Sequence, residues 1–180
     1  MKDLTEHFVS GEQVFDGKLL KVHRDVVRLP DGGESAREYI RHPGAVAIVA
    51  LFEDGRILLE RQYRYPQRRH FIEIPAGKLE PNEPHLETAK RELLEETGYT
   101  AAEWTRVGVV HTAIAYTDEA IELYLAKQLT GGTAKLDDGE FLETLVVPFA
   151  DAIAMIRDGR ITDVKTVAAL LWVDKWCRPC

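Results

Sequence analysis

Residues Gly77–Tyr99 read GKLEPNEPHLETAKRELLEETGY, and this stretch decides the fold. On an expected helix, the carboxylates of Glu92, Glu95 and Glu96 fall on one side, across an arc of about 100°. Like charges three or four positions apart on a helix repel each other by roughly 0.2–0.5 kcal/mol per pair. Such crowding predicts a counter-charge that the chain itself does not supply. Mg²⁺ is a natural candidate, because it is a hard cation that takes carboxylate oxygens and keeps several waters.

The same stretch carries the start and stop signals of a helix. Asn82 is a favourable N-cap, and Glu83 and Pro84 suit the first turn. Gly98 suits the position after the last turn, where a left-handed backbone is common. The side of the helix away from the carboxylates is expected to pack on a core. Its residues are Leu86, Ala89, Leu93 and Thr97.

The remaining sequence predicts a sheet-rich chain with a few helices. Residues 19–29 and 35–42 flank a Pro-Asp-Gly-Gly turn, which predicts a β-hairpin. A second hairpin is expected from residues 45–52 and 56–64, and the first of these is apolar enough to be a central strand. The other predicted strands are 71–75, 104–112, 120–129 and 141–149, and the predicted helices are 150–159 and 163–177. This pattern indicates an α+β fold, an α/β/α sandwich around a mixed sheet.

Composition bounds the class of protein. The chain has 180 residues, 45% hydrophobic and 29% charged, which is typical of a single globular domain with a sizeable core. Its net charge of −7 argues against nucleic acid as a partner, so an anionic substrate requires local arginines or bound metal. No apolar run reaches the roughly 20 residues of a membrane span, and the first residues lack the apolar segment of a secretory signal. We therefore expect a cytoplasmic protein that has no membrane partner.

Two cysteines stand near the end of the sequence, in Cys177-Arg178-Pro179-Cys180. One C-x-x-C pair supplies at most half of a zinc site, and the histidines show no ligand spacing. The expectation is a tail with reduced thiols in a cytoplasmic protein.

The stretch Gly77–Tyr99 matches the Nudix box, G-x5-E-x7-R-E-U-x-E-E-x-G-U with U apolar or aromatic, at every defined position. Four further segments resemble the ADP-ribose pyrophosphatase branch of the Nudix hydrolases: residues 36–51, 57–66, 71–80, which runs into the start of the box, and 159–172. The family fold is an α/β/α sandwich around a mixed sheet, in agreement with the pattern of elements. The resemblance implies a homodimer, with residues 1–43 as an N-terminal extension and β-hairpin at the dimer contact. Residues 44–180 are then the Nudix hydrolase domain.

The resemblance also implies a metal site on the helix, with about two or three Mg²⁺ or Mn²⁺ ions. The expected ligands are the carboxylates of Glu92, Glu95 and Glu96 and the backbone carbonyl of Ala76. Arg91 is assigned to orientation of the carboxylates, since it lies four residues before Glu95. Glu83 either supports the site or is a charge favoured at a helix N-terminus.

The general base is expected on the loop 135–143, downstream of the box. Glu140 is the first choice, and the alternatives are Glu143, Asp138 and Asp137. A solvated acidic turn is the competing interpretation of this run. The predicted catalytic set is Glu140, Glu92, Glu96 and Arg91.

Substrate anchoring requires positive charge near the metal, and guanidinium groups make forked hydrogen bonds to phosphate. By resemblance, the substrate-binding residues are Arg37, Arg64, Glu73 and Glu119. Arg68 and Arg69 are assigned to a surface turn, and Arg61 is either a further substrate anchor or a solvated surface residue. Adenine is expected to stack on an aromatic residue near the N-terminal hairpin, such as Phe15 or Tyr39.

The predicted reaction is metal-dependent hydrolysis of the diphosphate of ADP-ribose to AMP and ribose 5-phosphate. One departure bears on the substrate: Ile114 and Ala115 stand where many ADP-ribose enzymes have Pro-Gly, whose φ values shape that loop. Another nucleoside diphosphate sugar, or another X-linked nucleoside diphosphate, is therefore an open alternative. A non-catalytic ligand-sensing domain predicts lost box carboxylates, and an RNA-end hydrolase predicts a basic surface. The sequence shows neither feature.

Overall fold

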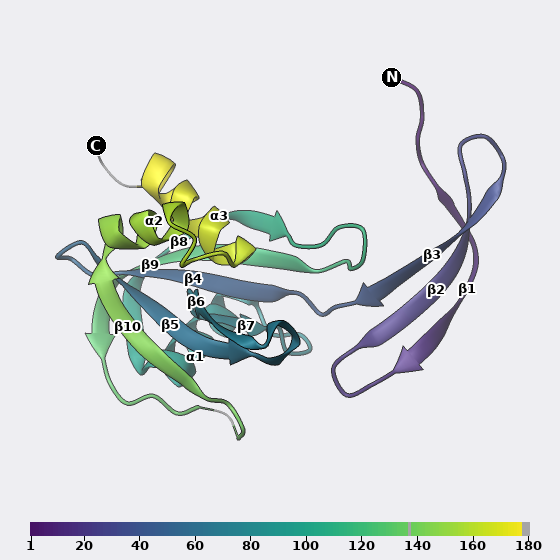
Figure 1. Cartoon of the computed structure of the whole chain (residues 1–180). Helices are drawn as coiled ribbons and strands as arrows, with labels where there is room; N and C mark the ends of the chain where they lie inside the picture. The colour runs from purple at the N-terminus through teal and green to yellow at the C-terminus, as the bar shows by residue number, and fades with distance from the viewer. Residues whose placement is uncertain (137, 178–180) are drawn as a thin grey trace. The chain divides into compact units, whose positions relative to one another are not determined.

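The structure is a computed structural model that describes residues 1–136 and 138–177 (Figure 1). Its contacts divide the chain into two compact units. The first contains residues 1–43 and 111–119, and the second contains residues 44–110 and the chain from residue 120 onward. The whole of Gly77–Tyr99 lies in the second unit.

The first unit is an antiparallel meander of β1 (His7–Asp16), β2 (Lys21–Arg28) and β3 (Glu34–Arg41). The predicted hairpin is confirmed, because β2 and β3 pair along their whole length and Gly32 takes a positive φ of 89° in the turn. β1 has no counterpart among the predicted strands. All of its residues are exposed, and its apolar and polar residues do not alternate, so the sequence carries no strand signal there.

The second unit is built on a mixed sheet. Its strands are β4 (Ala45–Leu51), β5 (Arg56–Arg64), β6 (Arg69–Glu73), β7 (Ala76–Lys78), β8 (Tyr99–His111), β9 (Ala120–Gly131) and β10 (Leu142–Pro148). The main order is β10-β5-β4-β9-β8, with β6 added to β5 and β7 added to β4. β4 and β9 run parallel, whereas β4 and β5 form an antiparallel hairpin. The prediction that residues 45–52 form a central strand is confirmed, because β4 lies between β5 and β9.

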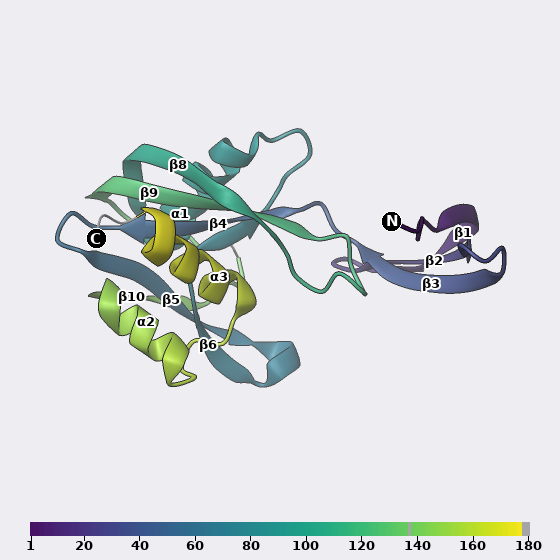
Figure 2. The same cartoon turned by 90° about the horizontal axis from the view of Figure 1, so that it is seen from above.

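Helices cover the two faces of this sheet, as Figures 1 and 2 show. They are α1 (His85–Thr97), α2 (Phe149–Arg157) and α3 (Val164–Trp172), with a short 3-10 turn at Tyr65–Gln67 between β5 and β6. α2 and α3 lie on one face, and α1 lies on the other. The predicted α+β sandwich is confirmed.

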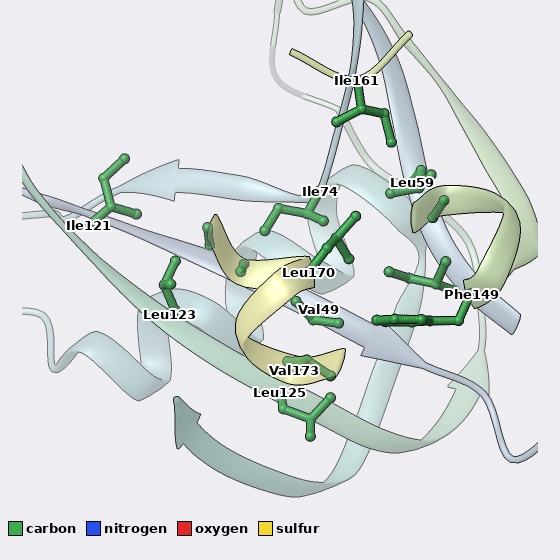
Figure 3. Packing of buried hydrophobic residues seen from close by; sticks show 14 of the residues in the cluster. Val49, Leu59, Ile74, Ile121, Leu123, Leu125, Phe149, Ile161, Leu170 and Val173 are labelled. Atoms are coloured by element: carbon green, nitrogen blue, oxygen red, sulfur yellow. The ribbon is translucent and has the colours of Figure 1, made fainter. Parts of the chain in front are cut away.

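The alternation of side chains along β4 builds both layers of the core. Val46 and Ile48 belong to a buried cluster that contains Leu93 of α1. Val49 belongs to the opposite cluster, where Figure 3 shows it near Leu170 of α3. Because β4 contributes side chains to both clusters, α1 and α3 pack against opposite faces of the same strand.

The start of α1 differs from the prediction. Pro84 is the N-cap and the helix begins at His85, whereas Asn82 has a φ of 64°. The expectation that Asn82 caps the helix is wrong, because an N-cap residue normally has an extended backbone. The predicted end is confirmed: Gly98 has a φ of 75°, and its N–H donates to the carbonyl of Leu94 (2.8 Å).

The C-terminal helical segment is divided into two parts. Asp163 caps α3 by accepting a hydrogen bond from the N–H of Thr166 (3.0 Å), and a π-helical turn follows at Val173–Cys177. Cys177 carries a free thiol, and Cys180 lies outside the described residues. Among the described residues, no helix combines the length and the apolar character that crossing a membrane requires.

Two neighbouring leucines of α1 test how the helix is held. Leu93→Ala should lower the free energy of unfolding by roughly 2–5 kcal/mol, because this side chain is fully buried against β4. Leu94→Ala, at a position that is 42% exposed, should lower it by less than about 1 kcal/mol. Urea denaturation of both variants measures the difference. Equal losses would mean that α1 does not pack through the predicted side.

Candidate active site

The close approach of β7 to α1 places the start of the box against the helix. β7 pairs with β4 at Val46↔Gly77, so the sheet fixes the path of this short strand. A Cβ atom on Gly77 would lie 1.8 Å from Cδ of Glu92, and Gly77 does not have a positive φ. Glycine is therefore required here because the carboxylate of Glu92 occupies the space of a side chain, and not because of backbone strain.

Arg91 holds three of the box carboxylates. Its guanidinium donates to both oxygens of Glu83 (3.0 and 2.9 Å), to Glu92 (2.8 Å) and to Glu95 (2.9 Å). The fork bonded to Glu83 lowers the pKa of that carboxyl to about 2. This geometry agrees with a role for Arg91 in orientation, and the same bonds give Glu83 a supporting position.

Glu96 lies apart from this arginine fork. It is buried, and its Oε2 accepts the backbone N–H of Ala76 (3.0 Å). Burial raises the pKa of Glu96 well above its usual range, and repulsion from Glu60 adds to the rise. Burial likewise raises the pKa of Glu92. The site therefore disfavours the ionised carboxylates unless a cation is present.

The loop after β9 brings Glu140 to the same cluster. The charge of Glu140 contributes to the raised pKa of each of three carboxyls, those of Glu60, Glu92 and Glu96. Glu143 instead pairs with Arg61 (3.0 Å) and is largely exposed. Asp138 is exposed, and Asp137 lies outside the described residues. Among these alternatives for the base, the geometry favours Glu140.

The predicted substrate residues Arg64 and Glu73 lie together in the second unit. Arg64 donates from two nitrogens to the carboxylate of Glu73 (2.7 and 2.8 Å), and Lys165 of α3 donates to the same carboxylate. Lys165 also donates to Asp163 (3.0 Å). Burial alone would raise the pKa of Glu73, but the bonds to Arg64 and Lys165 outweigh it and lower the pKa to about 2.

Arg37 and Glu119 lie in the first unit. Arg37 donates to Glu6 (2.9 Å) and to Ser35 (3.0 Å), and Glu119 accepts from the hydroxyl of Thr112 (2.6 Å). Their role in substrate binding stays a prediction. The candidates for adenine stacking are in this unit as well: Phe15 is exposed, and Tyr39 stacks on His23 at 5.6 Å between ring centroids.

Sequence reasoning missed two buried charged residues, Glu60 on β5 and Lys165 on α3. Glu60 is 4% exposed and Lys165 is 8% exposed. Each sits in an otherwise apolar run, Ile-Leu-Leu-Glu and Asp-Val-Lys-Thr-Val-Ala-Ala-Leu-Leu. A charged residue that borders or interrupts a run of apolar residues predicted to be buried is the signal that could have found them, because a buried charge requires a partner.

The donor atoms fit a hard divalent cation. The cluster offers carboxylate oxygens, which are ligands that Mg²⁺ and Mn²⁺ prefer. One of these oxygens, Oε1 of Glu60, is buried and has no hydrogen-bond partner among the described residues. Over residues 1–136 and 138–177, no group of three or more acids, histidines or cysteines is arranged so that it could hold a metal ion. Glu92 and Glu95 are bonded to Arg91 instead, so the assignment of Ala76, Glu92, Glu95 and Glu96 as ligands stays a prediction.

Residues 41–170 match the family model of the NUDIX domain, and residues 6–40 match that of the nucleoside diphosphate sugar hydrolase N-terminal domain. The chain therefore belongs to the Nudix family.

Individual relatives are similar along almost the whole chain. The protein is 40% identical over 175 residues to an ADP-ribose pyrophosphatase of Bacillus subtilis (strain 168), with 96% of this chain and 95% of that protein covered. It is 41% identical over 170 residues to a methanol dehydrogenase activator of Bacillus methanolicus, with 93% and 92% covered. A crystal structure of an ADP compounds hydrolase has the same fold, with a TM-score of 0.86 at 24% identity over 98% of this chain and 96% of that chain.

Gly77→Ala tests the contact between β7 and α1. The added methyl group should displace the carboxylate of Glu92 and leave the backbone in place, because the atoms it meets are at the end of a flexible side chain. We expect Mn²⁺ affinity, measured by calorimetry, to fall by about 10–100-fold. The melting temperature should change by only a few degrees, to about 4 °C at most.

Gly33→Ala is the matched control, since Gly33 has no positive φ and its Cβ would meet only the side chain of Asp31, at 3.2 Å. Its Mn²⁺ affinity should equal that of the original protein. Unchanged Mn²⁺ affinity in Gly77→Ala would show that Glu92 does not take part in metal binding.

Proposed function

We propose that this protein hydrolyses the diphosphate of ADP-ribose to AMP and ribose 5-phosphate with the help of a divalent cation. The observation that carries the reaction is the cluster of carboxylates around Glu96 of the Nudix box. Glu96 is buried, burial and neighbouring acids raise its pKa, and no cationic side chain of the described residues pairs with it. The identity of the substrate is supported by the relative named ADP-ribose pyrophosphatase, which is 40% identical and matches 96% of this chain.

The metal site of the proposed enzyme is formed by Glu92, Glu95, Glu96 and the carbonyl of Ala76, and it takes about two or three Mg²⁺ or Mn²⁺ ions. When bound, such ions screen the charge of the diphosphate and lower the pKa of a bound water. Arg91 holds Glu92 and Glu95 in fixed directions through its hydrogen bonds. The N–H of Ala76 fixes the direction of Glu96.

The remaining steps fall to residues outside the helix. Glu140 accepts the proton of the attacking water, since its charge lies beside the box carboxylates. Arg64 binds a phosphate or the terminal ribose from the position in which Glu73 holds it, and Lys165 bonds to the same carboxylate of Glu73. Arg37 and Glu119 contribute further contacts to the substrate.

A second candidate function is hydrolysis of another nucleoside diphosphate sugar. It is favoured by the match of residues 6–40 to the nucleoside diphosphate sugar hydrolase N-terminal domain. The loop with Ile114 and Ala115 also supports it, because this loop turns without Pro-Gly. The N–H of Tyr116 closes the turn by donating to the carbonyl of Ala113 (2.7 Å). The ligand-sensing alternative is less favoured, since the box carboxylates are all present.

Product analysis on a substrate panel tests the proposal. The panel contains ADP-ribose, NADH, GDP-mannose, ADP-glucose, diadenosine polyphosphates and dATP, each with Mg²⁺ and with EDTA. We expect AMP and ribose 5-phosphate from ADP-ribose in the presence of Mg²⁺ only, with the highest kcat/KM of the panel. A higher kcat/KM for another compound would mean that this compound, and not ADP-ribose, is the preferred substrate. A lack of turnover of every compound would contradict the proposed hydrolysis.

Two substitutions test the assigned roles. Glu140→Gln should lower kcat by about 10²–10⁴-fold with little change in the melting temperature, because it removes the base and keeps the shape. Glu96→Gln should lower kcat at least as much, through loss of metal. Glu143→Gln is the control, since this exposed neighbour pairs with Arg61 and should keep normal kcat. If Glu143→Gln were the inactive variant, the base would be wrongly assigned.

We also infer that the protein is a cytoplasmic homodimer that associates through residues 1–43. β1 is exposed along its whole length and presents Phe8, Val9, Val14 and Phe15 to the surface. Exposed apolar side chains gathered on one strand are typical of an association surface. The free thiol of Cys177 suits a reducing compartment.

Light scattering coupled to gel filtration measures the association. The expected mass is about twice the 20.4 kDa of the chain. The double variant Phe8→Asp with Phe15→Asp should shift the protein toward the monomer, since charges would be buried in the interface. A control with Glu12→Asp, an exposed position on the same strand, should keep the mass of the original protein.

A further inference from the structure

Glu60 is a buried acid that lies outside the Nudix box. It is on β5, in the register where Glu73 of β6 and Thr144 of β10 are its direct neighbours. Side chains directly opposite each other on paired strands point to the same face of the sheet, so Glu60 and Glu73 share a face. Leu58, two residues earlier, belongs to the buried cluster of α1. Glu60 therefore faces the layer that contains the box helix.

Within the part of the chain that the structure describes, Glu60 forms no ion pair with a cationic side chain. Burial is the main cause of its raised pKa, and the charges of Glu140 and Glu73 increase it further. Two cations, Lys165 and Arg64, partly offset this effect. Both are already bonded elsewhere: Arg64 to the two oxygens of Glu73, and Lys165 to Glu73 and Asp163.

Within the described structure, one oxygen of the Glu60 carboxylate therefore contributes no hydrogen bond to the stability of the fold. Oε1 of Glu60 is buried and lacks a hydrogen-bond partner among the described residues. A buried polar atom without a partner is unfavourable by about 1–3 kcal/mol, and each such atom in a folded protein calls for an explanation. Without Glu60, the set Arg64, Lys165, Glu73 and Asp163 would contain two cations and two anions. The fold therefore does not need Glu60 to neutralise these cations.

We propose that Glu60 is an additional ligand, directly or through a bound water, of a divalent cation held by the carboxylates around Glu96. The inference rests on the proposed function, because it extends the metal site of the same active centre to β5. Oε1 of Glu60 is the free acceptor, and hard cations such as Mg²⁺ and Mn²⁺ bind carboxylate oxygens or hold waters that donate to them. The bound cation then supplies the positive charge that neutralises the carboxylates of Glu60, Glu96 and Glu140.

Metal binding without substrate provides the test. Mn²⁺ is titrated into the full chain, and the free ion is followed by electron paramagnetic resonance. We expect Glu60→Gln to lower Mn²⁺ affinity by about 10-fold or more, or to remove one binding site. Glu87→Gln is the control: it removes an exposed carboxylate of α1 that pairs with Lys90, and it should bind Mn²⁺ as the original protein does.

Glu60→Leu provides a second variant in which no buried polar atom is left at this position. It should show the same loss of Mn²⁺ affinity. Its melting temperature without metal should rise by about 2–4 °C, because a buried polar atom without a hydrogen-bond partner is removed. Mn²⁺ should raise the melting temperature of Glu60→Leu less than that of the original protein.

Unchanged Mn²⁺ affinity and unchanged number of sites, in whichever of the two variants folds, would overturn the proposal. The result is independent of turnover. If the protein fails to hydrolyse ADP-ribose while Glu60→Gln loses Mn²⁺ affinity, the substrate is wrong and the assignment of Glu60 stands. If hydrolysis of ADP-ribose is found and Mn²⁺ affinity is unaffected, the function stands and the assignment of Glu60 is wrong.

Discussion

The guanidinium of Arg91 holds together a helix face that its own charges would otherwise drive apart. It donates to Glu83, Glu92 and Glu95, so three acids that repel one another share one cation. Arginine does not lose its proton in proteins, so this arrangement persists at any physiological pH. Glu96 is left to a neutral partner, the N–H of Ala76. The positions of the box side chains thus depend on one fixed fork and one backbone donor.

The sheet makes this arrangement possible by bringing the backbone of β7 to the helix. β7 is held in register by β4, which also supports α1 through Val46 and Ile48. The same strand therefore fixes both sides of the contact between Gly77 and Glu92. A site built between two elements that share a scaffold strand keeps its geometry better than a site on a loop.

Local patterns made much of this molecule predictable. The spacing of Arg91, Glu92 and Glu96 and the end of α1 at Gly98 follow from helix periodicity and capping, which involve residues close in sequence. The start of α1 differs from the predicted one, because Asn82 has a left-handed backbone conformation that its residue type does not reveal. The network of Glu73 and Lys165 was beyond sequence reasoning, since its members lie 92 positions apart. β1 escaped notice because an exposed strand has no alternation of apolar and polar residues.

In the part of the chain that the structure describes, the clustered acids that lack a cationic partner are only partly the ones that the sequence indicated. The sequence predicts that repulsion among Glu92, Glu95 and Glu96 requires a bound cation. In the structure, Arg91 already donates hydrogen bonds to two of these three acids, Glu92 and Glu95. Among residues 1–136 and 138–177, no hydrogen bond or ion pair joins a cationic side chain to Glu60 of β5, Glu96 of α1 or Glu140 of the loop before β10. Burial is the main cause of the raised pKa of both Glu60 and Glu96; the charge of Glu140 adds to both rises, and the charge of Glu60 adds to that of Glu96. A divalent cation at this place would neutralise groups from three separate segments, so it would stabilise the fold as well as supply the chemistry.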